Sequence, residues 1–236
     1  MRFLVTAGNT RERIDQVRDW GNIFTGNTGF AIARAMAELG DVDLLTSNRA
    51  HLASLPELAL PHPIHGTAFT THADLRTLLA EHMARASYDA IFMTAAVADY
   101  KPVRTYRVVS RETGPDGQER WLVQDVQAPK VGSTHGQIAV LAETTEKLVD
   151  LFRTEWGFRG LLVKFKLEVG RTKEELIEIG RKSRVASGAD YLVANTLDMV
   201  DGTSAGAYLI GQDDVEWVPR AQLPTRLRQL VESRGR

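Results

Sequence analysis

A glycine-rich stretch near the N-terminus, residues 17–33, contains the first residue types that could do chemistry. It follows an apolar run from Phe3 to Val5 that leads to Gly8, and it precedes a helical pattern that begins near Gly29. A strand, a glycine-rich loop and a helix in this order expose backbone N–H groups at a helix N-terminus, where the helix dipole favours anions such as phosphate. Roughly twenty residues separate strand and helix, far more than a strand–helix connection normally has.

The extra length of this loop needs a purpose, and Arg18 and Asn22 are the candidates for one. An asparagine amide can donate a hydrogen bond to a developing oxyanion, although asparagine in a glycine-rich loop usually serves turn geometry. Gly21, Gly26 and Gly29 do not have the spacing of the dinucleotide fingerprint. Phosphate binding and a merely tight turn therefore stay equally open at this stage.

Unusual residues also follow the other expected strands. Gly8 follows the first strand, residues 95–100 the third, residues 165–168 a later one, and Asn195 the last parallel one. Ligands of open parallel sheets bind beyond the carboxyl ends of the strands. We therefore expect these segments to converge on one nucleotide-sized site.

Each polar or aromatic candidate also has a structural interpretation. Asp99 could accept from a base or ribose, or serve as a cap, and Lys130 could meet a triphosphate or be simply solvated. The ring of Phe165 could stack on a base or pack in the core. His62 and His65 lie in a loop without helical ligand spacing, so we expect no metal site there.

Composition limits the class of protein. The chain has 236 residues, of which 43% are hydrophobic and 25% charged, with a formal net charge of -1. We expect one domain over residues 1–236, and the charge argues against nucleic acid as a partner. No cysteine is present, which excludes a disulfide scaffold, a thiolate zinc site and a cysteine nucleophile. No apolar run has the length of a signal peptide core or a membrane span, so we expect a cytoplasmic protein without a membrane partner.

The apolar periodicity predicts alternating strands and helices. We expect strands over residues 3–5, 42–46, 90–93, 161–165, 191–194, 207–210 and 215–218, and helices over residues 29–39, 73–86, 145–156, 172–187 and 223–231. Residues 48–63 read as a polar connection. Alternation of this kind indicates an α/β fold, a Rossmann-like, doubly wound and mainly parallel sheet.

One insertion interrupts the alternation. Two runs rich in β-branched residues, 105–110 and 120–126, flank the turn sequence Gly114-Pro115-Asp116-Gly117. This is hairpin chemistry. We therefore expect residues 101–136 to form an antiparallel β arm.

Taken together, these segments resemble the phosphopantothenoylcysteine synthetase family, also called phosphopantothenate cysteine ligase. The family's opening Thr-Ala-Gly-x-Thr-Arg-Glu segment is matched by residues 6–12, and its Ala-Ala-Val-Ala-Asp-Tyr signature stands unaltered at residues 95–100. Its Phe-x-x-Glu and Val-Ala-Asn segments appear at residues 165–168 and 193–195. Its Val-Arg-x-x-x-Asn-x-x-x-Gly-x-x-Gly segment is matched by Val17, Arg18, Asn22, Gly26 and Gly29.

The resemblance implies a two-step ligation in coenzyme A biosynthesis. The carboxylate of 4'-phosphopantothenate attacks the α-phosphate of a nucleoside triphosphate, and the amine of L-cysteine then displaces the nucleotide. By matching position, Asn22 and Lys130 are catalytic, and Arg18 and Ala96 bind phosphopantothenate. The nucleotide-binding positions would be Gly8, Gly26, Gly29, Ala95, Asp99, Phe165 and Asn195. The resemblance also implies Mg²⁺ with the triphosphate, metal ligands unknown, and a homodimer in which the arm crosses to the partner.

This sequence departs from the family pattern at three places. Phe24 and Thr25 stand where the family commonly has two serines. The stretch 101–129 is longer than in the usual bacterial form, so the match of Lys130 depends on the Lys130-Val131 pair and the following Gly-Ser. Residues 165–168 look more like the stand-alone and eukaryotic forms than the form fused to a flavin-dependent decarboxylase. Bacterial members are often fused to that decarboxylase domain, which this sequence lacks, so we expect a stand-alone synthetase. Because the fused form prefers CTP and the eukaryotic type can use ATP, the nucleotide stays open.

Two other functions remain as alternatives. A nicotinamide-dependent Rossmann oxidoreductase would share the strand–loop–helix opening, but it is opposed by the glycine spacing and by the lack of a plausible Tyr-x-x-x-Lys pair. A non-catalytic nucleotide-binding homologue would keep the fold after its altered loop had lost activity.

Overall fold

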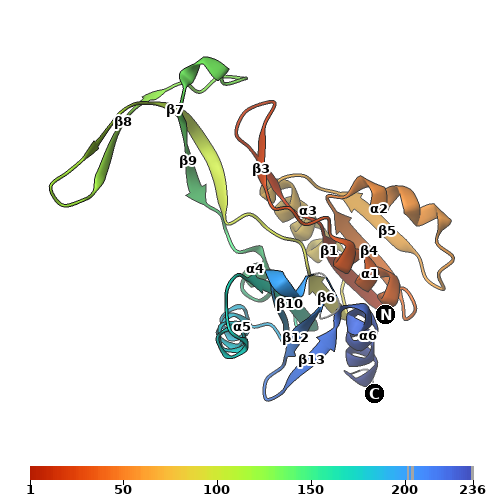
Figure 1. Cartoon of the computed structure of the whole chain (residues 1–236). Helices are drawn as coiled ribbons and strands as arrows, with labels where there is room; N and C mark the ends of the chain where they lie inside the picture. Colours follow the sequence, from red (N-terminus) through yellow and green to blue (C-terminus); the bar gives the residue numbers. More distant parts are fainter. Residues whose placement is uncertain (201, 203–204, 235–236) are drawn as a thin grey trace.

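The computed structural model describes residues 1–200, 202 and 205–234 (Figure 1). Its centre is an eight-stranded sheet in the order β13-β12-β11-β10-β6-β1-β4-β5. The neighbouring pairs from β11 to β5 are parallel, whereas β12 and β13 add an antiparallel hairpin at one edge. The strands are β1 Arg2–Ala7, β4 Asp41–Thr46, β5 Ile64–Ala68, β6 Ala90–Met93, β10 Leu161–Glu168, β11 Tyr191–Thr196, β12 Gly206–Ile210 and β13 Val215–Pro219. The predicted α/β fold with a mainly parallel sheet is confirmed.

Helices cover both faces of this sheet, as a doubly wound fold requires. One face packs against α1 Asn27–Met36 and α6 Leu223–Arg234. The other packs against α3 His72–Arg85 and α4 Leu148–Thr154, and α5 Lys173–Ser187 packs next to them on β11 and β12. The central strands are buried on both faces, which explains why β1 and β6 read as continuous apolar runs.

Several elements differ from the sequence prediction. Residues 48–63 contain a short helix, α2 Arg49–Ser54, and a 3₁₀ turn, Leu55–Glu57. His65 lies in the edge strand β5 and not in a loop. The long connection after β1 contains a small antiparallel hairpin, β2 Arg11–Arg13 with β3 Asp19–Gly21, so only its second half is the glycine-rich loop. These pieces are too short, or too polar, to give a recognisable period.

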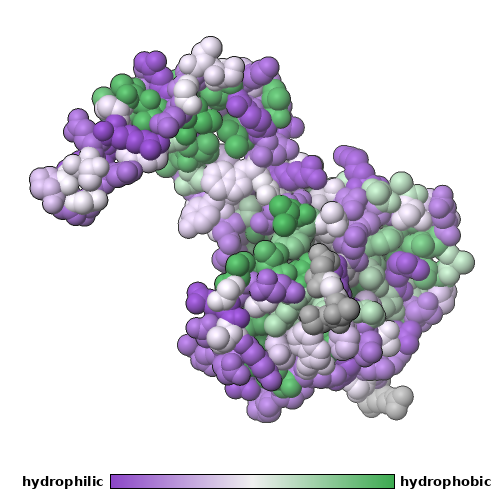
Figure 2. Space-filling model, in the orientation of Figure 1, coloured by the Kyte–Doolittle hydropathy of each residue, from purple (hydrophilic) through white to green (hydrophobic). Residues whose placement is uncertain are grey.

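The predicted arm is present and has one more strand than expected. β7 Tyr100–Thr113 pairs with β8 Glu119–Asp125 on one side and with β9 Ile138–Thr144 on the other. This three-stranded sheet extends away from the body of the molecule (Figure 1). Apolar side chains are exposed along it (Figure 2), among them Val109, Trp121, Leu122, Val123, Ile138 and Leu141.

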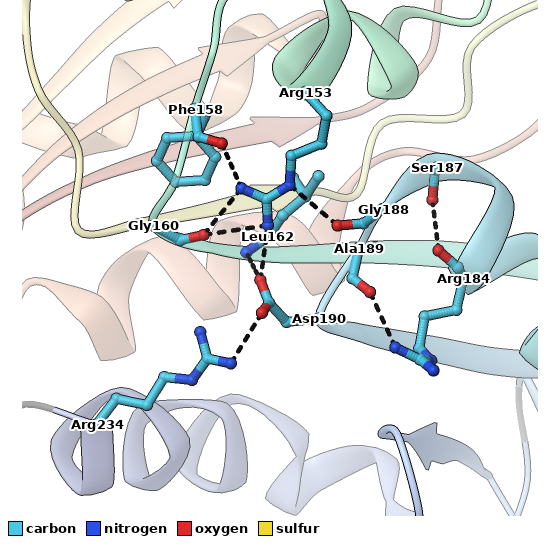
Figure 3. A network of polar contacts seen from close by, with 10 residues as sticks. All are labelled: Arg153, Phe158, Gly160, Leu162, Arg184, Ser187, Gly188, Ala189, Asp190 and Arg234. Carbon is cyan, nitrogen blue, oxygen red and sulfur yellow. Dashed lines mark hydrogen bonds and ion pairs between the residues drawn. The ribbon is translucent and has the colours of Figure 1, made fainter.

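A polar network lies at the amino ends of the parallel strands, where β10 and β11 begin (Figure 3). Arg153 of α4 donates to the carbonyl oxygens of Phe158, Gly160 and Gly188 at 2.5–3.2 Å, and its Nη2 lies 2.8 Å from Asp190 Oδ2. Asp190 also accepts from Arg234, near the end of α6. One carboxylate thus fastens helices from both faces to the sheet.

Candidate functional site

The glycine-rich loop crosses the end of β1 at van der Waals distance. A side-chain carbon added at Gly26 would lie 2.1 Å from the backbone nitrogen of Gly8, and one added at Gly29 would lie 2.2 Å from Thr94 Oγ1. Gly26 also has a positive φ of 81°. Only glycine satisfies both conditions at this point. The glycines therefore serve to bring the N-terminus of α1 directly onto the ends of β1 and β6.

The first turn of α1 presents backbone donors at this place. In the described part of the chain, no acceptor is found for the N–H groups of Asn27, Thr28 and Gly29. Free N–H groups and the positive end of the helix dipole favour an anion here.

The buried side chain of His51 holds the first turn of α1 in place. The ring of His51 stacks on Phe30 with centroids 4.4 Å apart, and its Nε2 lies 3.0 Å from Asn27 Oδ1. Asn48, whose amide also contacts this ring, donates to the carbonyl of Thr25 at 3.0 Å. Burial lowers the pKa of His51, which favours the neutral ring that such a packed position needs.

Two threonine side chains hold the loop that follows β6. Thr6 Oγ1 accepts from the N–H groups of Thr94 and Ala95 at 3.1 Å, and Thr10 Oγ1 accepts from that of Ala98 at 2.8 Å. The small residues of the 95–98 segment permit this close fit. The loops after β1 and β6, adjacent strands on either side of the topological switch point, therefore form one rigid floor.

Above this floor is a cleft of about 230 Å³, lined by the carboxyl ends of β1, β6, β10 and β11 and by the N-terminus of α1. Seven predicted site residues line it: Gly8, Gly26, Gly29, Ala95, Ala96, Phe165 and Asn195. Phe165 is half-buried and also packs against the core, so both interpretations of its ring hold. The predicted convergence of strand ends on one site is confirmed for these residues.

Asn22 lies at the edge of a second, more polar hollow of about 660 Å³, which shares Phe24 and Thr25 with the cleft. Its Nδ2 donates to the carbonyl of Ala96 at 3.4 Å, and its own carbonyl accepts from the side chain of Asn9. The Asn22 amide is therefore held at the boundary between the cleft and the hollow.

Three predicted site residues line neither the cleft nor the second hollow. Arg18 is paired with Asp15, with Nη2 and Oδ2 2.5 Å apart, and donates to the carbonyl of Val131. Asp99 is exposed and forms an ion pair with Lys147, and its contact with a nucleotide stays a prediction. Lys130 is exposed in the segment that joins β8 to β9. The sequence singled out these three residues as candidates, but their specific roles came from the family resemblance.

Sequence reasoning missed the part of the cleft that comes from the C-terminal third of the chain. Met199, Val200, Arg220 and Leu223 line it, and Arg220 donates to the carbonyl of Val200. They come from 3₁₀ turns and a helix start after β11, where no periodicity marks them. Lys166 also lines the cleft, although it pairs with Glu168 at 3.0 Å. In the sequence, only its position within the Phe-x-x-Glu segment indicated that Lys166 lies at the site.

Two other kinds of feature are absent from the described residues. Within residues 1–200, 202 and 205–234, no three His, Asp or Glu side chains come together as a metal-binding group. In the same ranges, no helix combines the length and apolar composition needed to cross a bilayer.

The fold and the cleft define the class: a doubly wound α/β protein with an anion-favouring cleft at its topological switch point. Residues 1–114 match the family model described as the DNA/pantothenate metabolism flavoprotein C-terminal domain. The crystal structure of the DNA/pantothenate metabolism flavoprotein from Streptococcus pneumoniae superimposes with a TM-score of 0.78 at 26% identity, covering 99% of both chains. The resemblance to this family that was seen in the motifs is confirmed.

Curated relatives agree. The chain is 30% identical over 235 residues to the coenzyme A biosynthesis bifunctional protein CoaBC of Thermococcus kodakarensis, covering 98% of this chain and 51% of the relative. It is 37% identical over 204 residues to that of Bacillus subtilis, covering 86% and 42%. The chain therefore spans about half the length of the curated relatives it matches. A Cab2 structure in complex with phosphopantothenate-cysteine has the same fold at 14% identity, with a TM-score of 0.65, covering 99% of this chain and 88% of that one.

Proposed function

We propose that this chain ligates 4'-phosphopantothenate to L-cysteine through an acyl-nucleotide intermediate, in coenzyme A biosynthesis. The observation that carries the proposal is the position of Asn22, held against Ala96 where the cleft meets the second hollow. The names of the curated relatives, coenzyme A biosynthesis bifunctional proteins, support the same pathway.

The nucleoside triphosphate would occupy the cleft with its phosphates at the N-terminus of α1. A carboxylate oxygen of the acid attacks the α-phosphorus, the bond to the β-phosphate oxygen breaks, and pyrophosphate leaves. The free N–H groups of Asn27, Thr28 and Gly29 would bind phosphate oxygens during this step. Asn22 faces the junction where the acyl group would lie.

In the second step the free amine of cysteine attacks the acyl carbon. A tetrahedral oxyanion forms, its C–O bond to the phosphate breaks, the nucleoside monophosphate leaves, and the nitrogen loses a proton to solvent. Asn22 Nδ2 would donate to that oxyanion, an interaction that strengthens as the charge develops. The role of Lys130 at the triphosphate stays a prediction, because in this chain its exposed side chain would have to reach the cleft from the segment that joins β8 to β9.

Magnesium is proposed as the companion of the triphosphate. Proteins commonly hold Mg²⁺ with one or two carboxylates plus substrate phosphates. The described residues lack a group of three His, Asp or Glu side chains that could hold the ion alone. The substrate phosphates would thus supply most of its ligands, and the ion would neutralise phosphate charge.

Pyrophosphate release tests the function directly. Purified protein is supplied with phosphopantothenate, cysteine, Mg²⁺ and either CTP or ATP, and we expect release with at least one nucleotide. No release with either one would remove the proposal.

The role of Asn22 is tested with Asn22→Asp. A carboxylate cannot donate to the oxyanion, so we expect pyrophosphate release with phosphopantothenate to continue while transfer to cysteine falls about 100-fold or more. Gln212→Glu, which adds the same charge in the exposed turn between β12 and β13, is the control. Equal loss of both half-reactions would contradict the assignment.

The exposed apolar side chains of the arm support the homodimer implied by the family resemblance. A three-stranded sheet that extends from the body with many apolar residues facing water is typical of a docking element. We propose a second copy of this chain as its partner.

A further inference from the structure

The carboxylate of Asp15 is buried in the turn between β2 and β3, with 6% of the residue exposed. Its Oδ1 accepts from the backbone N–H groups of Val17 and Arg18, both at 2.8 Å. These two bonds close the turn locally. The other oxygen, Oδ2, accepts from groups that are not all local.

Asp15 Oδ2 joins two distant segments. It accepts from Arg18 Nε at 3.0 Å and from Arg18 Nη2 at 2.5 Å, and it accepts from the backbone N–H of Val131 at 3.1 Å. Arg18 Nη2 in turn donates to the carbonyl of Val131 at 2.6 Å. Asp15, Arg18 and Val131 thus form a closed ring of hydrogen bonds, which we call the clasp.

Neighbouring contacts reinforce the clasp. The N–H of Gln16 donates to the carbonyl of Pro129 at 2.9 Å, and Gln127 Nε2 donates to the carbonyl of Ile14 at 3.3 Å. Val131 is itself buried, at 2% exposure. The turn before β3 is therefore fastened to the segment by which the chain returns from β8 of the arm.

The clasp acts on residues that the proposed function uses. Asn22 follows the last residue of β3, so the turn sets the position of the strand that delivers it. Arg18 donates hydrogen bonds from Nε and Nη2 within the clasp, while its side chain is 42% exposed. Among the described residues Nη1 has no acceptor, so it is available to an anionic substrate. The hydrogen bond from Arg18 and those from the backbone hold the pKa of Asp15 well below its usual range, so the carboxylate stays ionised in any assay near neutral pH.

We propose that Asp15 is a positioning residue that couples the arm to the site: by holding Arg18 and Val131 together, it fixes the arginine and the Asn22-bearing hairpin relative to the segment of the arm that joins β8 to β9. The inference rests on the proposed function for its substrate, phosphopantothenate. The coupling itself can be measured without turnover.

The test compares Asp15→Asn with a matched control, Asp116→Asn. Asp116 is also a turn carboxylate that accepts from a backbone N–H, that of Gln118, and from a guanidinium, that of Arg120 at 3.2 Å. It lies at the tip of the arm, away from the clasp. In Asp15→Asn one carboxylate oxygen becomes an NH2 group, which accepts no hydrogen bond, so the side chain can no longer accept both the turn N–H groups and the donors from Arg18 and Val131.

Two readouts are needed. Hydrogen–deuterium exchange should become faster in both segments, 14–22 and 127–131, in Asp15→Asn and in neither for Asp116→Asn. The KM for phosphopantothenate in pyrophosphate release should rise about tenfold, while the KM for the nucleotide changes less than about twofold. Arg18→Gln should raise the same KM, and the double variant should be no worse than the more impaired single one.

The outcomes separate the two proposals. Faster exchange in 14–22 alone would show that Asp15 closes a local turn and would overturn the coupling. Faster exchange in both segments with unchanged affinity for phosphopantothenate would overturn the positioning role. If the wild type releases no pyrophosphate, the proposed function fails, and calorimetric binding of phosphopantothenate to the wild type and Asp15→Asn decides the positioning role in place of KM.

Discussion

At the scale of single residues, the site is governed by how closely backbone approaches backbone. Gly26 passes the nitrogen of Gly8 with no room for a methyl group, and its left-handed φ adds a second restriction. The floor of the cleft therefore requires glycine at this position, because any side chain would collide with the neighbouring backbone. Substitution of this glycine should therefore be more damaging than substitution of the polar residues around the cleft.

Gly26→Ala tests this directly. We expect a loss of roughly 1–3 kcal/mol of stability from strain, together with weakened nucleotide binding because the start of α1 must shift. The control is Gly117→Ala, which has a similar φ of 74° but nothing within 4 Å of the added carbon. Chemical denaturation and calorimetric titration with CTP or ATP measure both quantities. Equal effects of the two variants would mean that φ alone matters and the close approach does not.

Asp15 gives a pH-dependent prediction at the same scale. Its folded-state pKa is lowered, chiefly by the hydrogen bond from Arg18, so its contribution is complete above the unfolded-state pKa of about 3.9 and is lost as pH falls toward the folded-state value. The stability difference between wild type and Asp15→Asn should therefore be constant from pH 7 to about pH 5 and shrink below about pH 4. Urea denaturation between pH 2 and pH 7 measures it. A difference that already shrinks near neutrality would contradict this linkage.

At the scale of elements, a helix can be predicted from its sequence when capping residues mark its ends. The helix predicted over residues 172–187 is α5: Thr172 and Glu175 form both reciprocal bonds of a capping box at its start, and Gly188 is its left-handed C-cap. By contrast, β5 and β9 carry no clear alternation of buried and exposed residues, and the sequence analysis did not find them. Their pairing depends on neighbouring strands that are distant in sequence or on the geometry of the arm.

Thr172→Ala should remove one capping bond of α5. We expect a loss of about 1 kcal/mol, which corresponds to a fall of roughly 2–4 °C in Tm for a chain of this size. Thr172→Ser retains the hydroxyl and should recover most of the loss. A Tm for the alanine variant equal to that of wild type would show that the box contributes nothing measurable.

The presence or absence of a local sequence pattern also separates the predicted site residues from the missed ones. Gly8, Ala95 and Asn195 follow apolar runs, so the rule that parallel strands end at one edge places them together. Asp15 meets Val131 across 116 positions, and no local pattern marks either residue as a partner. Contacts of this kind depend on the path of the arm, which follows from tertiary structure alone.

At the scale of the whole molecule, body and arm have different stabilisation. The body buries its strands between helices, whereas the arm is a three-stranded sheet with apolar residues exposed to water. The hairpin turn predicted such an arm, but its partner comes only from the family resemblance. A homodimer therefore remains a prediction that sedimentation can test.

Leu122→Glu combined with Leu141→Glu should weaken self-association. These side chains are 62% and 50% exposed in the isolated chain, and a charge there would be buried on docking. Sedimentation velocity should show a dimer for wild type and a monomer for the double variant, at about 10 μM protein. Val185→Glu and Val169→Glu, at exposed positions of 67% and 65% outside the arm, form the control. An unchanged sedimentation coefficient in the arm variant would place any interface elsewhere.

The strand order of the arm has a consequence for solubility. Because β7 is the central strand, β8 and β9 each leave one edge with unpaired backbone groups, and such edges can add strands from any other chain. On β8 the apolar residues Leu122 and Val123 lie between charged ones, Glu119 and Arg120 on one side and Asp125 on the other. These charges oppose edge-to-edge pairing, so neutralising them should turn the arm into the place where aggregation of this protein begins.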